Sequence, residues 1–195
     1  MQAIRVRDLV SGTILAGAVA GTDTLRSLTG CLPPKASGDP TPLFLDFSGI
    51  ELATASFLRE SIIPFKAVAR HLCSSWYPVA ANISPATVED LDVICRVRAD
   101  AMLVCRLDDS GVHHDAQLVG HLDAKQKEAF DFVTARGEAT AKELMDATKA
   151  DSGSPVSPTA WNNRLTALVE KRVIADYQLG RQKVYVPILR VKHGY

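Results

Sequence analysis

The 195-residue sequence has few cysteines and no long apolar run. Its four cysteines, Cys31, Cys73, Cys95 and Cys105, form no CxxC motif, which argues against a zinc ribbon and a thioredoxin-like redox pair. A chain of this length buries a sizeable core without cross-links, so we expect these thiols in the core of a reduced protein. No stretch approaches about 18 uninterrupted apolar residues, so we expect no transmembrane helix and no membrane partner.

The chain also lacks the short motifs of common enzymes. It has no GxxxxGK[ST] loop and no GxGxxG turn, and Ser48 does not lie in a GxSxG elbow. The only local cluster of metal-ligating residue types is His113-His114-Asp115, and adjacent residues of a strand point to opposite faces. We therefore expect no catalytic residues, no metal site and no cofactor.

The first residues resemble a secretory signal peptide in part. Arg5 and Arg7 precede a run of apolar and small residues at 9–20. Asp8 interrupts the basic segment, and polar residues break the apolar run near its start. We therefore expect a cytoplasmic protein.

Charge of one sign is not in excess, because 22 Lys and Arg balance 22 Asp and Glu. This balance excludes a protein coated in positive charge, but the charges are unevenly distributed. Residues 157–195 hold seven basic and two acidic residues, whereas residues 1–121 hold 10 basic and 13 acidic ones. The seven basic residues are Arg164, Lys171, Arg172, Arg181, Lys183, Arg190 and Lys192. A basic segment of this kind favours contact with phosphates.

Strand-like and helix-like segments alternate over residues 1–121. The expected strands cover residues 2–10, 43–47, 77–83, 101–107 and 112–118, with the last two forming a hairpin. The expected helices cover residues 16–32 and 58–72, and a further helix begins at Ser84-Pro85. Pro64 lies inside the second pattern, so either two helices abut there or one helix is kinked. The alternation predicts an α/β domain with a mixed sheet.

Residues 122–195 have the pattern of three helices followed by a β-hairpin. Asp123 is placed to cap the first helix, and Thr140 and Glu143 have capping-box spacing before the second. The third helix begins at Ser157-Pro158 and carries an apolar stripe of Trp161, Leu165, Leu168 and Val169. Strand patterns at 173–179 and 183–188 follow, joined by residues 180–182. This order is typical of a winged helix-turn-helix domain.

The C-terminal segment also resembles bacterial winged helix-turn-helix domains directly, over residues 122–190 and most closely in AWNNRLTALVEKRVI. The resemblance implies that the third helix enters the major groove and that the hairpin tip touches phosphates or the minor groove. With the apolar stripe inward, the outer face of this helix presents side chains that contact base edges. Arg181 and Lys183 lie at the hairpin tip, where they can reach phosphate. We therefore expect double-stranded DNA to be contacted by seven residues: Thr159, Asn162, Asn163, Arg164, Thr166, Arg181 and Lys183. Alternatively, these are ordinary solvated residues and the domain docks onto protein, which Glu170 on the same face favours.

The segment PLFLDFSGIELATASFLRESI resembles the central strand, loop and helix of STAS-like domains, the fold of anti-sigma-factor antagonists. The resemblance covers residues 1–118 and implies binding to a protein partner. Regulated antagonists carry an Asp-Ser pair where this chain has Thr54-Ala55-Ser56, so alanine stands at the phospho-acceptor position, although Ser56 or Thr54 can substitute. Ser48, Thr54 and Ser56 are the candidate partner-binding residues. The closer likeness is to STAS-like domains of unestablished function fused to a winged helix.

The sequence thus predicts a STAS-like α/β domain at 1–121 and a winged helix domain at 122–195. The expected function is that of a bacterial DNA-binding regulator whose first domain mediates protein interaction or dimerisation, with a homodimer expected by analogy. The alternative is a protein-interaction adaptor that acts with a kinase-like ATPase or a sigma-factor regulator without binding DNA.

Overall fold

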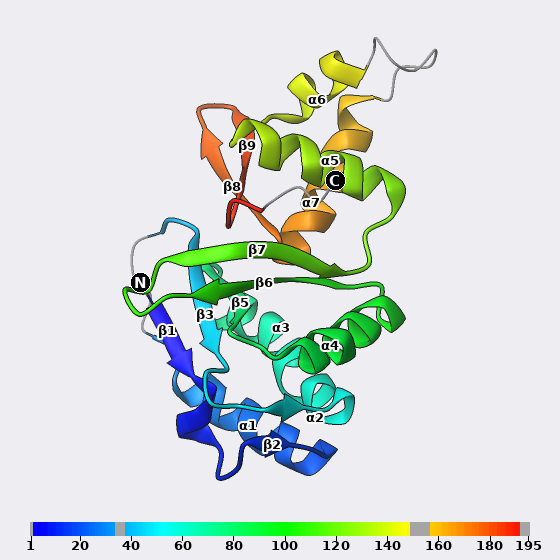
Figure 1. Ribbon diagram of the computed structural model, residues 1–195. Helices are drawn as coiled ribbons and strands as arrows, with labels where there is room; N and C mark the ends of the chain where they lie inside the picture. The colour runs from blue at the N-terminus through cyan, green and yellow to red at the C-terminus, as the bar shows by residue number, and fades with distance from the viewer. Residues whose placement is uncertain (1, 34–37, 149–156, 192–195) are drawn as a thin grey trace. The chain divides into compact units, whose positions relative to one another are not determined.

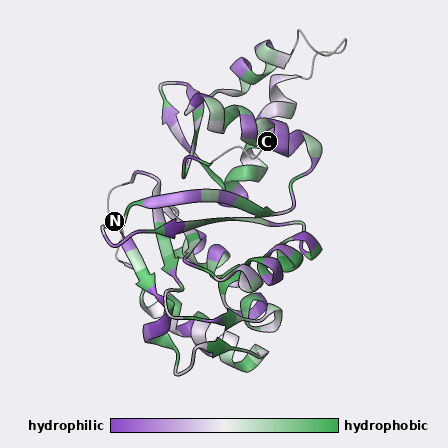
Figure 2. Cartoon of the chain, viewed as in Figure 1, coloured by the Kyte–Doolittle hydropathy of each residue, from purple (hydrophilic) through white to green (hydrophobic). Residues whose placement is uncertain are grey.

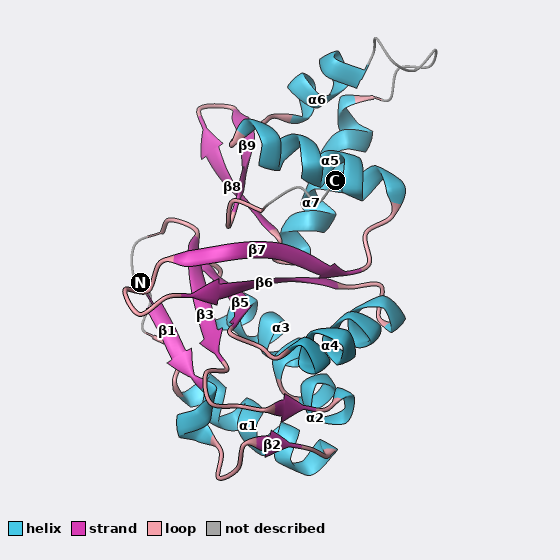
Figure 3. Cartoon of the chain, viewed as in Figure 1, coloured by secondary structure: helices cyan, strands magenta, loops and turns pink. Residues whose placement is uncertain are grey.

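The chain folds as two units, Met1–His121 and Leu122–Tyr195 (Figure 1). The computed structural model describes residues 2–33, 38–148 and 157–191. Figure 3 distinguishes the helices and strands of each unit.

A five-stranded mixed sheet forms the centre of the first unit, in the order β1-β3-β5-β6-β7. Four neighbouring strands are parallel: β1 (Gln2–Arg5), β3 (Thr41–Asp46), β5 (Trp76–Ala81) and β6 (Ala101–Leu107). The last strand, β7 (His113–Gly120), pairs antiparallel with β6. The mixed α/β class expected from the sequence is confirmed.

The helices of this unit lie in the connections between parallel strands. They are α1 (Ala18–Gly30), α2 (Ala55–Glu60), α3 (Ile62–Leu72) and α4 (Pro85–Val97). Each connection moves the chain one strand further in the same direction, and such crossovers are right-handed, so the helices lie on one face of the sheet. Between that face and the helices lies a core that includes Leu45 of β3, Phe57 of α2 and Leu91 of α4. In Figure 2 these helices carry both hydrophobic and hydrophilic residues, as amphipathic helices do.

In the first unit the structure differs from the expected elements at two places, β1 and a pair of short strands, and it decides between the two alternatives at Pro64. β1 ends at Arg5, and a 3-10 helix, η1 (Val6–Leu9), replaces the rest of the expected strand. The pattern around Pro64 is two abutting helices that meet at Ser61, so Pro64 lies in the first turn of α3, where a missing N–H costs no hydrogen bond. The short strands β2 (Ile14–Leu15) and β4 (Leu52–Ala53) pair in parallel and were not expected.

Two close contacts surround the connection from α4 to β6: Lys66 of α3 binds its end, and Gly120 of β7 packs against Cys95 of α4. Lys66 is 5% exposed, and its Nζ donates to Asp100 Oδ2 at 2.8 Å and to the Ala101 carbonyl at 2.6 Å. Gly120 has φ +100, and a Cβ there would overlap Cys95 and the backbone of Asp100. This close approach requires glycine, because no larger residue fits the space or the backbone angle.

The described part of the second unit has three helices followed by a hairpin. They are α5 (Ala124–Arg136), α6 (Ala141–Thr148), α7 (Pro158–Glu170), β8 (Ile174–Leu179) and β9 (Gln182–Pro187). The expected caps are confirmed: Asp123 accepts from the backbone of Gln126 at 2.8 Å, and Thr140 and Glu143 form a reciprocal capping box. Ala139 bridges Tyr185 of β9, so a third backbone segment pairs with the hairpin.

The four cysteines are free, and three of them are buried. Cys31 is exposed at the end of α1, so the expectation of a core position is wrong for that residue. Among the described residues, no helix combines the length and apolar character needed to span a membrane.

Candidate nucleic-acid interface

The helix α7 forms because its first turn is capped and one of its faces is apolar. Ser157 precedes the helix and accepts a hydrogen bond from Ala160 N at 3.2 Å, and Pro158 occupies the first helical position. Trp161, Leu165 and Leu168 are each 0% exposed, so the expected inward stripe is confirmed for these three residues.

The opposite face of α7 is polar and accessible. Thr159 and Asn163 are exposed, Thr166 is half-buried, and Glu170 is exposed at the end of the helix. Asn163 and the two threonines are uncharged side chains that can donate to and accept from base edges. Glu170 places a negative charge on the same face, which opposes phosphate at that end.

Asn162 lies on the flank of α7 and fastens the helix to the hairpin. The Tyr185 hydroxyl of β9 donates to Asn162 Oδ1 at 2.6 Å. Tyr185 is 0% exposed, and burial raises the pKa of its phenol above the ordinary value, so the phenol keeps the proton that it donates. One side of the Asn162 amide is therefore committed to holding α7 and β9 together.

Arg164, on the same helix, lies against an aromatic ring. Its guanidinium carbon is 4.5 Å from the centroid of the Trp161 ring, a cation–π contact. Its Nη1 is buried and has no acceptor among the described residues. A contact from Arg164 to a guanine edge would require the side chain to leave the Trp161 ring. The helical wheel placed Arg164 on the flank of the helix but did not predict this contact with Trp161.

The hairpin ends in a two-residue turn. Leu179 pairs with Gln182, and Gly180 has φ +62 at the first central position, which type II′ turns require of glycine. Arg181 is exposed at the tip. Lys183 forms an ion pair with Asp176, with Nζ 2.8 Å from Oδ2, and is 5.8 Å from the centroid of the Tyr185 ring.

The basic charge of this unit is therefore less available than the sequence count suggests. Arg172 follows α7 with φ +64 and is 4% exposed, so it belongs to the interior. Lys183 is paired, and Lys192 lies outside the described residues. Arg181 and Arg190 are exposed. We expect few phosphate contacts and a moderate salt dependence from such a surface.

Ser48 of the first unit belongs to a hydrogen-bond network at the carboxyl ends of β3 and β5. Its hydroxyl donates to Asp46 Oδ1 at 2.7 Å, and Asn82 Nδ2 donates to Ser48 Oγ at 2.9 Å and to Asp46 Oδ1 at 2.8 Å. Asn82 also accepts from Leu107 N at 2.9 Å. The sequence interpretation missed Asn82. Its position as a polar residue directly after the buried strand β5 is the feature that could have indicated it.

Thr54 and Ser56 lie at the start of α2 in a different set of hydrogen bonds. Their hydroxyl oxygens are 3.2 Å apart, and Gly17 N donates to Ser56 Oγ at 3.3 Å. Ala55 N donates to Asp90 Oδ2 at 2.9 Å, so a carboxylate from α4 already occupies this helix start. A phosphate there would meet the Asp90 charge, which disfavours a phosphorylation switch at this position.

His113 and His114 make separate contacts, as their adjacency in a strand predicts. His113 stacks on Phe44 with centroids 6.2 Å apart, and His114 Nε2 lies 2.9 Å from Asp108 Oδ2. Hydrogen bonds from Ser110 and then His114 hold the pKa of Asp108 below its ordinary value. Within residues 2–33, 38–148 and 157–191, no three His, Cys, Asp or Glu side chains are grouped to hold a metal ion.

Comparison with known proteins does not assign the chain to a family. No family model matches the chain, and neither a curated protein nor a solved structure matches it.

Proposed function

We propose that the chain is a DNA-binding regulatory protein whose second unit is a winged helix-turn-helix domain. In this proposal α7 enters the major groove and the β8–β9 hairpin is the wing. The observation that carries the proposal is the hydrogen bond of Tyr185 to Asn162, at 2.6 Å. It fastens the flank of α7 to β9 of the wing, and contact with one duplex requires both elements in a fixed arrangement.

Each side chain of this surface has a distinct role in the proposal. Asn163 reads an adenine edge, and Thr159 and Thr166 contact neighbouring bases or thymine methyl groups. Arg181 at the wing tip contacts phosphate, which supports affinity without selecting sequence. Lys183 supports the wing through Asp176 and contributes less to affinity.

The first unit is proposed to be a STAS-like domain that binds a protein partner or a second copy of the chain. Support comes from the segment that resembles this family, which forms the strand β3 and the helix α2 joined by a connection that also contains the short strand β4. The partner surface is proposed to include Ser48, Thr54 and Ser56. A homodimer would present two winged helices to paired half-sites.

The test is binding of the full chain to fluorescein-labelled duplex DNA, measured by anisotropy at several salt concentrations. Arg181→Ala is expected to weaken binding to all sequences alike and to lower the salt slope by about one. Asn163→Ala is expected to cost about 1–3 kcal/mol on a selected site and little on random duplex. Lys127→Ala is the matched control, because Lys127 is an exposed lysine of α5 that pairs with Asp131.

The second candidate function is a protein adaptor that does not bind DNA. Exposed Glu170 on the polar face of α7 and the pairing of Lys183 with Asp176 favour it. The anisotropy experiment separates the two, because an adaptor shows no saturable binding at low salt. Co-purification with a kinase-like ATPase or a sigma-factor regulator would then support the adaptor.

A further inference from the structure

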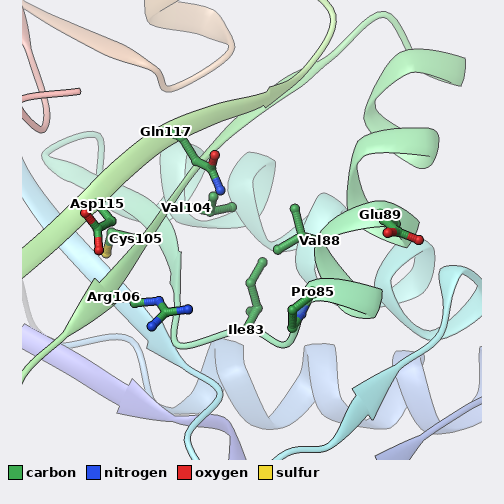
Figure 4. Close-up of a pocket in the computed structure, with 9 residues that line it drawn as sticks. All are labelled: Ile83, Pro85, Val88, Glu89, Val104, Cys105, Arg106, Asp115 and Gln117. Carbon is green, nitrogen blue, oxygen red and sulfur yellow. The ribbon is translucent and has the colours of Figure 1, made fainter. Parts of the chain in front are cut away.

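A pocket of about 610 Å³ lies in the first unit, between the start of α4 and the paired strands β6 and β7 (Figure 4). Its apolar lining includes Ile83, Val88 and Val104, together with Pro85. Val104 belongs to the hydrophobic core, and Ile83 and Val88 are partly buried against that core. The core therefore reaches the surface here, in a pocket of a size that suits small molecules.

Polar side chains surround this apolar part. Arg106, Asp115 and Gln117 line the pocket from β6 and β7 and are exposed. The pairing of β6 with β7 shifts register between Val104 and Arg106, and Asp115 has φ +50. β-Bulges redirect side chains and occur often beside functional sites, and aspartate is one of the few residues that tolerates this backbone angle.

The charged side chains that line the pocket are of both signs: Arg106 is basic, and Asp115 and, on the α4 side, Glu89 are acidic. The Arg106 guanidinium has no hydrogen bond or ion pair with any described residue, so its donors are available to a ligand. Figure 4 shows Arg106 and Asp115 on one side of the pocket and Val88 on the other. A guanidinium binds a carboxylate in a bidentate manner, and a carboxylate accepts hydrogen bonds from an ammonium group.

We propose that this pocket binds a free α-amino acid with an aromatic side chain. The ligand carboxylate pairs with Arg106, its ammonium group pairs with Asp115, and its ring lies over Val88 and Val104. The volume of about 610 Å³ favours an aromatic side chain over a small aliphatic one. The site lies within the first unit, so it does not depend on the proposed DNA contact.

The ligand is bound without covalent chemistry. Cys105 is the pocket's one nucleophilic side chain among the described lining residues, and burial, followed by the nearby Asp46 charge, raises its pKa to about 12. The thiol therefore remains protonated at neutral pH and is a poor nucleophile.

Three probes that share one phenylethyl body test the proposal: L-phenylalanine, 2-phenylethylamine and 3-phenylpropionate. Each is titrated into the ¹⁵N-labelled full chain, and the amide shifts of Val104 and Gln117 are followed. L-phenylalanine is expected to give saturable shifts and to bind at least about tenfold more tightly than either analogue, because each analogue loses one charge-assisted hydrogen bond. Arg106→Gln should abolish the preference over 2-phenylethylamine, and Asp115→Asn the preference over 3-phenylpropionate.

Arg98→Gln is the matched control, because Arg98 is an exposed arginine of the same unit that does not line the pocket. Asparagine also tolerates a positive φ, so Asp115→Asn tests the charge without straining the bulge. The absence of saturable shifts with millimolar L-phenylalanine would overturn the proposal. Equal affinity for the three probes, or equal loss in the Arg98 and Arg106 variants, would also overturn it.

Discussion

The hydrogen bond between Tyr185 and Asn162 gives the sharpest prediction about the second unit. Tyr185→Phe removes the hydroxyl and leaves the ring, so the packing of a side chain that is 0% exposed is retained. The bond is 2.6 Å long, and its acceptor on the half-buried Asn162 is left without its partner. A typical hydrogen bond contributes about 0.5–1.5 kcal/mol, and an orphaned acceptor adds to the loss. We expect the free energy of unfolding of this unit to fall by about 1–2 kcal/mol.

The assay is urea unfolding followed by tryptophan fluorescence. Each unit holds one tryptophan, Trp76 in the first and Trp161 in the second. A Trp76→Phe background therefore reports the second unit through Trp161, which is 0% exposed. The midpoint should shift with little change in the m-value, because the surface exposed on unfolding is unchanged.

Tyr177→Phe is the matched control. Its hydroxyl donates to Glu138 over 3.3 Å, and the residue is 37% exposed, so we expect a change below about 0.5 kcal/mol. If Tyr185→Phe costs no more than Tyr177→Phe, the bond does not hold α7 to the hairpin, and the reasoning that treats these two elements as one surface is refuted.

Three further predictions concern the first unit. Gly120→Ala is expected to lower the free energy of unfolding of this unit by more than about 2 kcal/mol in denaturant unfolding. The added Cβ would overlap Cys95 and the backbone of Asp100, and the residue has φ +100. An unchanged unfolding midpoint would contradict the close approach. Asp100→Ala is expected to cost about 3–5 kcal/mol in the same assay, because it removes the carboxylate that pairs with the buried Lys66 ammonium. A cost below about 1 kcal/mol would contradict this. With a thiol reagent at pH 8, exposed Cys31 should react fast and Cys105 slowly, because burial raises the pKa of Cys105 to about 12. Equal reaction rates in variants that keep only one of these cysteines would contradict this prediction.

Local features of the fold were predictable from the sequence. The caps at Ser84, Asp123, Thr140 and Ser157 each use residues within three positions along the chain, so their spacing is visible without a structure. The α7 stripe was equally visible, because a helical period of 3.6 residues assigns its buried face.

The contacts of the candidate interface were harder to predict because they depend on strand register. The sequence interpretation joined the two strands by residues 180–182, whereas the turn contains Gly180 and Arg181 alone. This register places Lys183 opposite Gln178 and within reach of Asp176, so the ion pair follows from a one-residue difference in the loop. A charge count along the sequence contained no information on that pairing.

Other features depend on packing between distant segments. Nothing local distinguishes Arg172, which is 4% exposed, from an ordinary surface arginine after a helix. Asn82 joins Asp46 and Leu107 across 36 and 25 positions of sequence, and the β2–β4 pair joins segments that are similarly far apart. Such contacts depend on the tertiary arrangement, because no periodicity in the sequence encodes them.

The salt dependence of DNA binding by the full chain tests the central claim most directly. For two to four phosphate contacts from the accessible basic side chains, the logarithm of the binding constant should fall with the logarithm of salt concentration with a slope of about −2 to −4. Saturable binding with such a slope, reduced by about one in Arg181→Ala, is the predicted result. No saturable binding at low salt, or a slope unaffected by Arg181→Ala, would contradict the proposal that this unit contacts DNA.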